Sequence, residues 1–166
     1  LPFPVLGHTN YSAWGLTMSM VDDLNIYQEK IDAQDKTKVM YKNEWVDIEQ
    51  YNEIIKVKGE KDQVVSIKLT PHGPMLDESK FGQAGKILSL SWSVYHPDDF
   101  SLRALYEIPH AQSVQEFKSA IAFSAAPGVN VSWVHKRGDI AWWAMGKAPK
   151  LPDGVSTDLI LKGWDG

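Results

Sequence analysis

The segment at residues 128–146, GVNVSWVHKRGDIAWWAMG, constrains the fold of this chain more than any other. Two aromatic-rich runs flank the turn residues Arg137, Gly138 and Asp139. Apolar residues that alternate on both sides of a glycine-containing turn are typical of a β-hairpin. We therefore expect a domain whose framework is made of strands.

Further strand patterns follow one another along the chain. Two β-rich segments, 11–20 and 24–29, flank the Asp22–Asp23 pair and predict a hairpin or a strand-to-strand bend there. Alternating or turn-bounded runs predict additional strands at 38–48, with a turn at Asn43, at 52–70, with a turn at Gly59–Glu60, and at 86–92. The charges of residues 29–63 are mixed in sign, which favours a solvated outer sheet for this part.

The hydrophobic period changes once, between about residues 96 and 125. Leu102, Leu105 and Tyr106 fall on one helical face, and Pro109 should end that helix. A second helical face is formed by Val114, Phe117 and Ile121, with Ser113 as N-cap and Glu116 at capping-box spacing. The predicted class is α+β, strand-dominated, as one fragment over 1–166 with a helical insert at about 96–125.

Composition excludes several classes of protein. A net charge of −4 argues against a nucleic-acid partner, and no apolar run reaches the roughly 18 residues of a membrane span. The chain has no cysteine and therefore no disulfide or thiolate chemistry. It does not begin with Met, so we expect a piece of a longer precursor. The seven tryptophans indicate a packed core, an apolar pocket or an interface.

Residues Asp22 to Asn25 form the most informative polar stretch. A paired carboxylate at a strand end can be a solvated turn, a metal site or catalytic machinery, and composition favours the solvated turn. Calcium requires several oxygen ligands, and a bend could gather Asp22, the Leu24 carbonyl and Asn25. The five histidines lack metal-binding spacing, and His72 is expected to bond a loop carbonyl in its turn. There is no G-x-S-x-G nucleophile motif and no phosphate-binding loop.

Five segments together resemble the penicillin acylase (penicillin amidase) family of N-terminal-nucleophile hydrolases. They are GHTNYSAWGLTMSMVDDLNIYQE, TPHGPML, LSLSW, GVNVSWVHKRGDIAWWAMGKAP and the closing GWDG. The first block is the most specific of them, and the resemblance extends over nearly the whole chain. It implies a portion of an αββα architecture, contributed by an internal fragment of the larger, β chain of an acylase.

The resemblance also implies a mechanism. In that family a Ser released as a new N-terminus attacks an amide carbonyl, with its own α-amino group as base. A backbone N–H and an Asn side chain stabilise the oxyanion. The N–H corresponds here to Met18, whereas the nucleophile should precede Leu1 and the Asn should follow Gly166. We therefore expect the 166 residues alone to be inactive.

Two further sites are implied by the same resemblance. A structural calcium would be bound by Asp22, the backbone carbonyl of Leu24 and Asn25, with Thr157 as a further backbone ligand. The family usually has Asp at the position of Asn25, and the lost charge should weaken binding. An apolar acyl pocket would be lined by the positions Leu6, Leu16, Met20, Trp92 and Val129, although apolar strand residues are more often core.

The leading hypothesis is thus part of a bacterial, periplasmic or otherwise exported amidohydrolase. It would cleave N-acyl amides such as penicillins, cephalosporins or N-acyl homoserine lactones. Its partners would be the remainder of the acylase chains and a small substrate, with neither nucleic acid nor membrane. The alternative is a non-catalytic, carbohydrate-binding β module, which would require Trp14, Trp92 and Trp142 to lie on the surface. A homologue that has lost its nucleophile is a third possibility.

Overall fold

The computed structural model describes residues 3–81 and 85–166, and the chain divides into two compact units. The first unit comprises Leu1–Asp23 and Trp92–Val155, and the second comprises Leu24–Ser91 and Ser156–Gly166. Within the described ranges, no helix is both long and apolar enough to cross a membrane.

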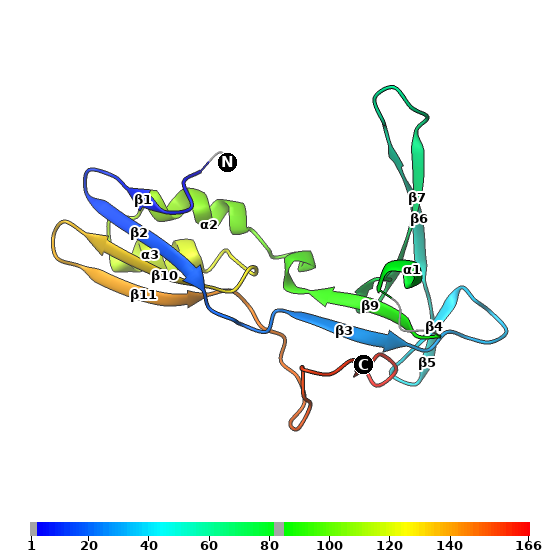
Figure 1. Cartoon of the computed structure of the whole chain (residues 1–166). Coiled ribbons are helices and arrows are strands. Elements are labelled where there is room, and N and C mark those ends of the chain that lie inside the picture. Colours follow the sequence, from blue (N-terminus) through cyan, green and yellow to red (C-terminus); the bar gives the residue numbers. More distant parts are fainter. Residues whose placement is uncertain (1–2, 82–84) are drawn as a thin grey trace. The chain divides into compact units, whose positions relative to one another are not determined.

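The first unit contains an antiparallel sheet with the strand order β1-β2-β10-β11 (Figure 1). Its helical elements are short. The bounds of the elements are β1 Gly7–His8, β2 Ser12–Met18, η1 Ser93–Tyr95, α2 Ser101–Glu107, η2 Ile108–His110, α3 Val114–Ile121, β10 Val129–His135 and β11 Ile140–Met145. The predicted hairpin is thus confirmed as β10 and β11, and Gly138 adopts a φ of +97° in its turn.

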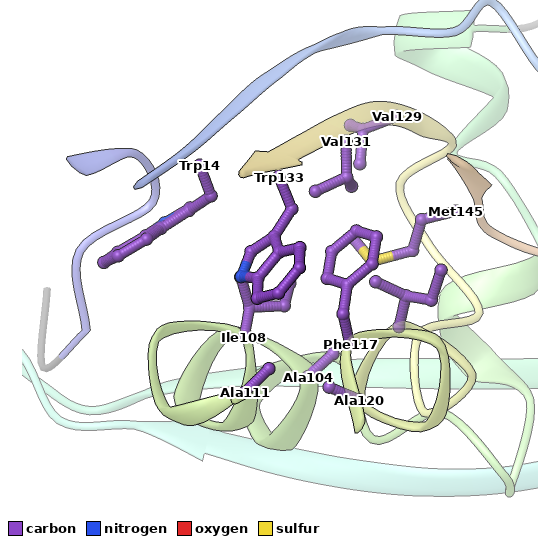
Figure 2. Packing of buried hydrophobic residues seen from close by; sticks show 11 residues of the cluster. Trp14, Ala104, Ile108, Ala111, Phe117, Ala120, Val129, Val131, Trp133 and Met145 are labelled. Atoms are coloured by element: carbon purple, nitrogen blue, oxygen red, sulfur yellow. The ribbon is translucent and has the colours of Figure 1, made fainter. Parts of the chain in front are cut away.

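The core of this unit lies between the sheet and the helices. Every second residue of β10 points inward, so Val131 and Trp133 are buried while Ser132 and Val134 are exposed. The ring of Trp133 stacks on Phe117 of α3, with centroids 5.5 Å apart and an interplanar angle of 11°. Figure 2 shows these two rings side by side within the apolar cluster.

The inner face of α2 differs from the prediction. Leu102 and Tyr106 are exposed, and Ala104 of α2, followed by Ile108 at the start of η2, instead contributes to the core. A small residue allows the helix backbone to approach the large rings of the sheet, which a pattern based on bulky residues does not detect. The face predicted for α3 is confirmed at Phe117 and Ile121.

The N-terminus of α3 is capped as the sequence predicts, with one difference. The Ser113 hydroxyl accepts a hydrogen bond from the Glu116 N–H at 3.2 Å. The Glu116 carboxylate, however, accepts from the N–H of Gln112 at 2.8 Å. In the standard capping box, Glu116 would accept a hydrogen bond from the N–H of the N-cap residue Ser113. Here it accepts instead from the N–H of Gln112, one residue earlier.

The second unit is assembled from small sheets, with the strand orders β12-β3-β9, β4-β5 and β6-β7-β8. The bounds of its elements are β3 Leu24–Glu29, β4 Lys38–Tyr41, β5 Glu44–Asp47, β6 Glu49–Ile55, β7 Gln63–Thr70, β8 Gly73–Pro74, α1 Glu78–Phe81, β9 Ile87–Trp92, whose last residue falls in the first unit, and β12 Leu161–Lys162. The β6–β7 ribbon exposes most of its side chains, as expected for a solvated outer sheet.

The Asp22–Asp23 pair lies in a bend between sheets. Strand β2 pairs with β1 and β10, whereas β3 belongs to the sheet with β12 and β9. Of the two predicted alternatives, the hairpin is therefore wrong and the strand-to-strand bend is confirmed.

Candidate functional site

Strand β2 leaves its sheet directly after Met18. The Ser19 N–H donates to the Gly128 carbonyl at 3.2 Å, so these opposite residues form a hydrogen-bonded pair. Antiparallel strands alternate between hydrogen-bonded and non-hydrogen-bonded pairs. Met18, opposite Val129, is therefore in a non-hydrogen-bonded pair, and its backbone N–H points away from β10.

The edge of β2 that this N–H faces is open in the described part of the chain. Strand β1 pairs with β2 only at Gly7–Trp14 and His8–Ala13, and this pairing ends before Met18. The Met18 side chain lies at the end of the sheet and the residue is 61% exposed. A backbone donor at such an edge can bind an external carbonyl or oxyanion.

The bend after Met18 has a fixed conformation. Met20 adopts a left-handed φ of +56°, which is uncommon for a residue other than glycine, and is 85% exposed. Val21 packs directly on Gly128, because a Cβ added to Gly128 would lie only 2.6 Å from the Val21 Cβ. The close approach of these two segments therefore requires glycine at position 128.

The two aspartates of the bend have different environments. Asp22 is exposed, and among the described residues its carboxylate has no hydrogen-bond or ion-pair partner. Asp23 is half-buried, and its Oδ2 accepts a hydrogen bond from the Gly128 N–H at 3.2 Å. The solvated turn that composition favours therefore does not describe Asp23, because the bend turns its carboxylate onto Gly128, the residue before β10.

Asn25 has an unusual environment at the start of β3. It is 3% exposed, and its side-chain oxygen has no hydrogen-bond partner in the described structure. Leu24 is exposed and Thr157 is half-buried. Asp22 belongs to the first unit and the other three to the second. A buried, unpartnered amide oxygen fits a calcium ligand in donor type, and the carboxylate of Asp22 and the carbonyl of Leu24 are also hard oxygen donors.

Within residues 3–81 and 85–166, no three His, Cys, Asp or Glu side chains gather closely enough to hold a metal. The predicted calcium set contains only one carboxylate, so it does not depend on such a cluster. Further oxygen ligands would have to come from other parts of the protein.

The residues predicted for the acyl pocket differ in burial. Val129 is buried in the core, and Leu16, diagonally adjacent on the same sheet face, is packed against that core. Trp92 is half-buried, and its ring lies edge-on to the ring of Tyr95, with a centroid distance of 6.0 Å. Leu6 and Met20 are both exposed. The structure thus brings Leu16 and Val129 together on the inner face of the sheet, whereas Leu6 and Met20 lie on the surface of the first unit.

The second unit contains a buried polar network around Glu29. One carboxylate oxygen, Oε1, accepts hydrogen bonds from the Thr70 hydroxyl at 2.7 Å and the Ser89 hydroxyl at 2.5 Å. The same oxygen lies 3.1 Å from His72 Nδ1. The His72 ring also stacks on Tyr27, with a centroid distance of 3.9 Å. The prediction that His72 bonds a loop carbonyl is therefore wrong, because the ring reaches a strand carboxylate.

Glu29 remains a carboxylate despite its burial. Burial by itself raises its pKa, but hydrogen bonds from His72, Ser89 and Thr70 and the charge interaction with His72 outweigh this effect. The pKa of Glu29 therefore lies below its ordinary value. The network ties the end of β3 to the β7–β8 turn and to β9.

The three tryptophans named for the carbohydrate-binding alternative do not lie together on the surface. Trp14 and Trp133 lie in the core, and Trp92 is half-buried. Of the three tryptophans that would have to lie on the surface, only Trp142 does, with 63% of its area exposed. The structure therefore provides no support for the carbohydrate-binding alternative.

Comparison with solved structures identifies the fold. A thermostable penicillin G acylase from Alcaligenes faecalis superposes with a TM-score of 0.82 and 25% identity, over 99% of this chain and 29% of that chain. The chain is therefore an α+β, strand-dominated portion of an N-terminal-nucleophile hydrolase fold, as the sequence predicts.

Sequence comparison agrees with this fold. The family model for penicillin amidase matches residues 1–166. An acyl-homoserine lactone acylase, QuiP of Pseudomonas fluorescens (strain Pf0-1), is 27% identical over 168 residues, covering all of this chain and 20% of the relative. Penicillin G acylase of Escherichia coli is 23% identical over 169 residues, covering 99% of this chain and 19% of the relative. The chain belongs to the penicillin amidase family, and it spans about a fifth of the length of these curated relatives.

Two polar groups were missed by sequence reasoning. The Asp23–Gly128 bond joins residues 105 positions apart, and Glu29 reaches Thr70, His72 and Ser89 across 41 to 60 positions. Alternation along each strand shows which face a residue occupies but not which distant segment covers it. Glu29 ends a predicted strand, but no local sequence signal shows that it is buried and needs hydrogen-bond partners.

Proposed function

We propose that the protein containing this chain hydrolyses N-acyl amide bonds. The family match over the whole chain supports this proposal, as do the two kinds of relative, which are named for penicillin G and for acyl-homoserine lactones. The substrate would be a small N-acyl compound, either a β-lactam amide or an N-acyl homoserine lactone.

The reaction follows the N-terminal-nucleophile scheme that the resemblance implies. A Ser hydroxyl outside this chain attacks the acyl carbon, its proton passes through the α-amino group to the leaving amine, and water then hydrolyses the acyl ester. The Met18 N–H stabilises the oxyanion of each tetrahedral intermediate. The observation that carries this assignment is the orientation of that N–H, away from β10 and toward an open sheet edge.

This orientation makes a selective test possible. Proline at position 18 removes the N–H without removing a hydrogen bond to β10, whereas alanine keeps the N–H. In the full-length acylase we expect Met18→Pro to lower kcat by about 100- to 1,000-fold and Met18→Ala to retain most activity. Equal activities of the two variants would contradict the proposed role of the N–H.

The acyl group would contact Leu6, Leu16, Met20, Trp92 and Val129. The aliphatic side chains and the Met at several of these positions favour an aliphatic or broad acyl preference. Turnover of octanoyl and phenylacetyl amides by the full-length protein tests this proposal. A strong preference for the phenylacetyl amide would count against it.

We also propose a structural calcium ion, bound in part by Asp22, the Leu24 carbonyl and Asn25, with Thr157 as a further backbone ligand. The buried, unpartnered oxygen of Asn25 supports this set. Calorimetry of the full-length protein should show calcium binding that Asn25→Asp strengthens, because a carboxylate adds charge, and that Asn25→Leu weakens. Absence of binding to the unmodified protein would refute the proposal.

The proposal extends to the rest of the protein and to its location in the cell. The functional unit would combine this chain with the rest of the acylase, which would be exported to the bacterial periplasm. The 166 residues alone would be inactive, because the proposed scheme assigns the nucleophile to no residue among them. Hydrolysis of a chromogenic phenylacetyl amide by the purified chain would contradict this expectation.

A further inference from the structure

We propose that Asp23 is a positioning residue that holds the Met18 N–H in the direction required for oxyanion binding. This inference rests on the proposed function for its catalytic consequence, and on the geometry of the first unit for its structural part. Asp23 acts through Gly128 and Ser19, which lie between its carboxylate and the Met18 backbone.

The strand pair formed by Ser19 and Gly128 is incomplete. In a hydrogen-bonded antiparallel pair each residue donates to the other. Ser19 donates its N–H to the Gly128 carbonyl at 3.2 Å, but the Gly128 N–H donates to Asp23 Oδ2, also at 3.2 Å. The Asp23 carboxylate thus takes the place that the Ser19 carbonyl would occupy in a continuing ladder. Strand β2 can therefore end at Met18 without leaving the Gly128 donor unsatisfied.

The bend packs closely against Gly128. The Val21 side chain lies against Gly128, and a Cβ built on Gly146 would lie only 2.9 Å from the Gly128 Cα. Gly128 is therefore enclosed by two segments and has little freedom to shift if its hydrogen bond to Asp23 is lost.

The peptide between Met18 and Ser19 connects Gly128 to Met18. The peptide between Met18 and Ser19 is held through both of its polar groups: the Asn130 amide donates to the Met18 carbonyl at 3.2 Å, and the Ser19 N–H donates to Gly128. The position of this peptide limits the torsions of Met18 and hence the direction of its own N–H. Asp23 therefore influences Met18 through one continuous set of hydrogen bonds.

Asp23 is itself fixed at its backbone. Its N–H donates to the Val21 carbonyl at 3.0 Å, and its carbonyl accepts from the Ser93 N–H at 2.9 Å. The Ser93 hydroxyl in turn donates to the Ala125 carbonyl at 3.2 Å, three residues before Gly128. The carboxylate is thus held in place before any substrate binds, as positioning requires.

The experiment compares Asp23→Ala with Asp23→Asn in the full-length acylase. Asparagine keeps an oxygen acceptor for the Gly128 N–H, whereas alanine removes it. For Asp23→Ala we expect kcat to fall about 10- to 100-fold with little change in KM, because a small displacement of a catalytic donor is costly. Asp23→Asn should retain most of the kcat of the unmodified protein. Hydrogen exchange of peptides containing Ser19 and Gly128 should accelerate at least tenfold in Asp23→Ala and remain near the unmodified rate in Asp23→Asn.

Two controls separate positioning from general effects. Asp153→Ala removes an exposed carboxylate in the same unit and should change neither readout. Ser113→Ala destabilises α3 without contacting the bend and should leave kcat unchanged at a temperature where the protein is folded. Both assays are run with and without added calcium, since Asp23 adjoins a proposed calcium ligand.

Each result decides the proposal. Unchanged exchange and kcat in Asp23→Ala would overturn it, as would equal losses in the alanine and asparagine variants. Recovery of Asp23→Ala by excess calcium would also overturn it and would assign Asp23 to the metal. If the unmodified protein hydrolyses no N-acyl amide, the proposed function fails, whereas the exchange measurement still decides whether Asp23 positions this peptide.

Discussion

Replacing Glu29 by Gln should destabilise the second unit. Among all Asp→Asn and Glu→Gln substitutions in this unit, we expect it to have the largest effect. Glu29 is 5% exposed, and its Oε1 is the common acceptor for Thr70, Ser89 and His72. Glutamine keeps one oxygen but loses the charge and introduces an NH₂ group. That group would occupy the place of Oε2, which has no hydrogen-bond partner in the described structure.

The magnitude follows from the contacts. A hydrogen bond to a charged group contributes about 1.5–3 kcal/mol. Three bonds to one oxygen are not additive, so their sum is an upper limit. Glutamine keeps an acceptor oxygen but loses the charge on which the strength of all three bonds depends, so we expect a loss of about 3 kcal/mol for Glu29→Gln.

Hydrogen exchange of the full-length protein measures this loss locally. Peptides covering β3, the β7–β8 turn and β9 should exchange at least about 100-fold faster, since 1.4 kcal/mol corresponds to a factor of ten. Glu53→Gln on the exposed β6 strand is the matched control and should have little effect. A change below about 1 kcal/mol at Glu29 would refute the conclusion that the network stabilises these three strands together.

The same network predicts the direction of a pH effect. The pKa of Glu29 is lowered in the folded state, so the unfolded state binds more protons as the pH falls. The stabilisation should be complete above about pH 4.3, the ordinary value for Glu, and should be lost as the pH falls toward the folded-state pKa. The pH dependence of exchange in the unmodified protein should therefore exceed that in Glu29→Gln between pH 6 and pH 3, and parallel profiles would contradict the lowered pKa.

Three further substitutions test the packing. Ser113→Ala should lower the free energy of unfolding by about 1 kcal/mol, measured by urea denaturation, because it removes the N-cap of α3. Phe117→Ala should cost about 3–5 kcal/mol in the same assay, because it leaves a cavity beside Trp133. Gly73→Ala should prevent native packing of the β7–β8 turn, seen as loss of exchange protection there, because its φ is +134° and the new Cβ would lie within van der Waals overlap of the Leu90 carbonyl oxygen.

Local patterns predicted most of the strands. Segment 24–29 is strand β3 with the expected bounds, and the predicted strand at 86–92 begins one residue later. Alternation and turn residues determine these elements, and both are properties of neighbouring residues. The helix α3 was predictable for the same reason, since Ser113 caps it three residues before Glu116.

Contacts between distant segments were not predictable in this way. The inner face of α2 was misassigned because the residue that approaches the sheet is the small Ala104 and not the bulky Leu102. The partners of Asp23 and Glu29 depend on which strands become neighbours, which alternation does not specify. The sequence drew attention to the Asp22–Asp23 pair but not to Glu29, and the fold determined what each of these carboxylates contacts.

The bend gives the identical side chains of Asp22 and Asp23 different environments. The Asp23 carboxylate already accepts the Gly128 N–H, so binding a cation there would weaken the bond that ends the β2 ladder. The Asp22 carboxylate is exposed and has no such partner in the described structure, so it can bind a cation without that cost. If calcium binds at this bend, the structure therefore favours Asp22 as its ligand and leaves Asp23 to hold the backbone that presents Met18.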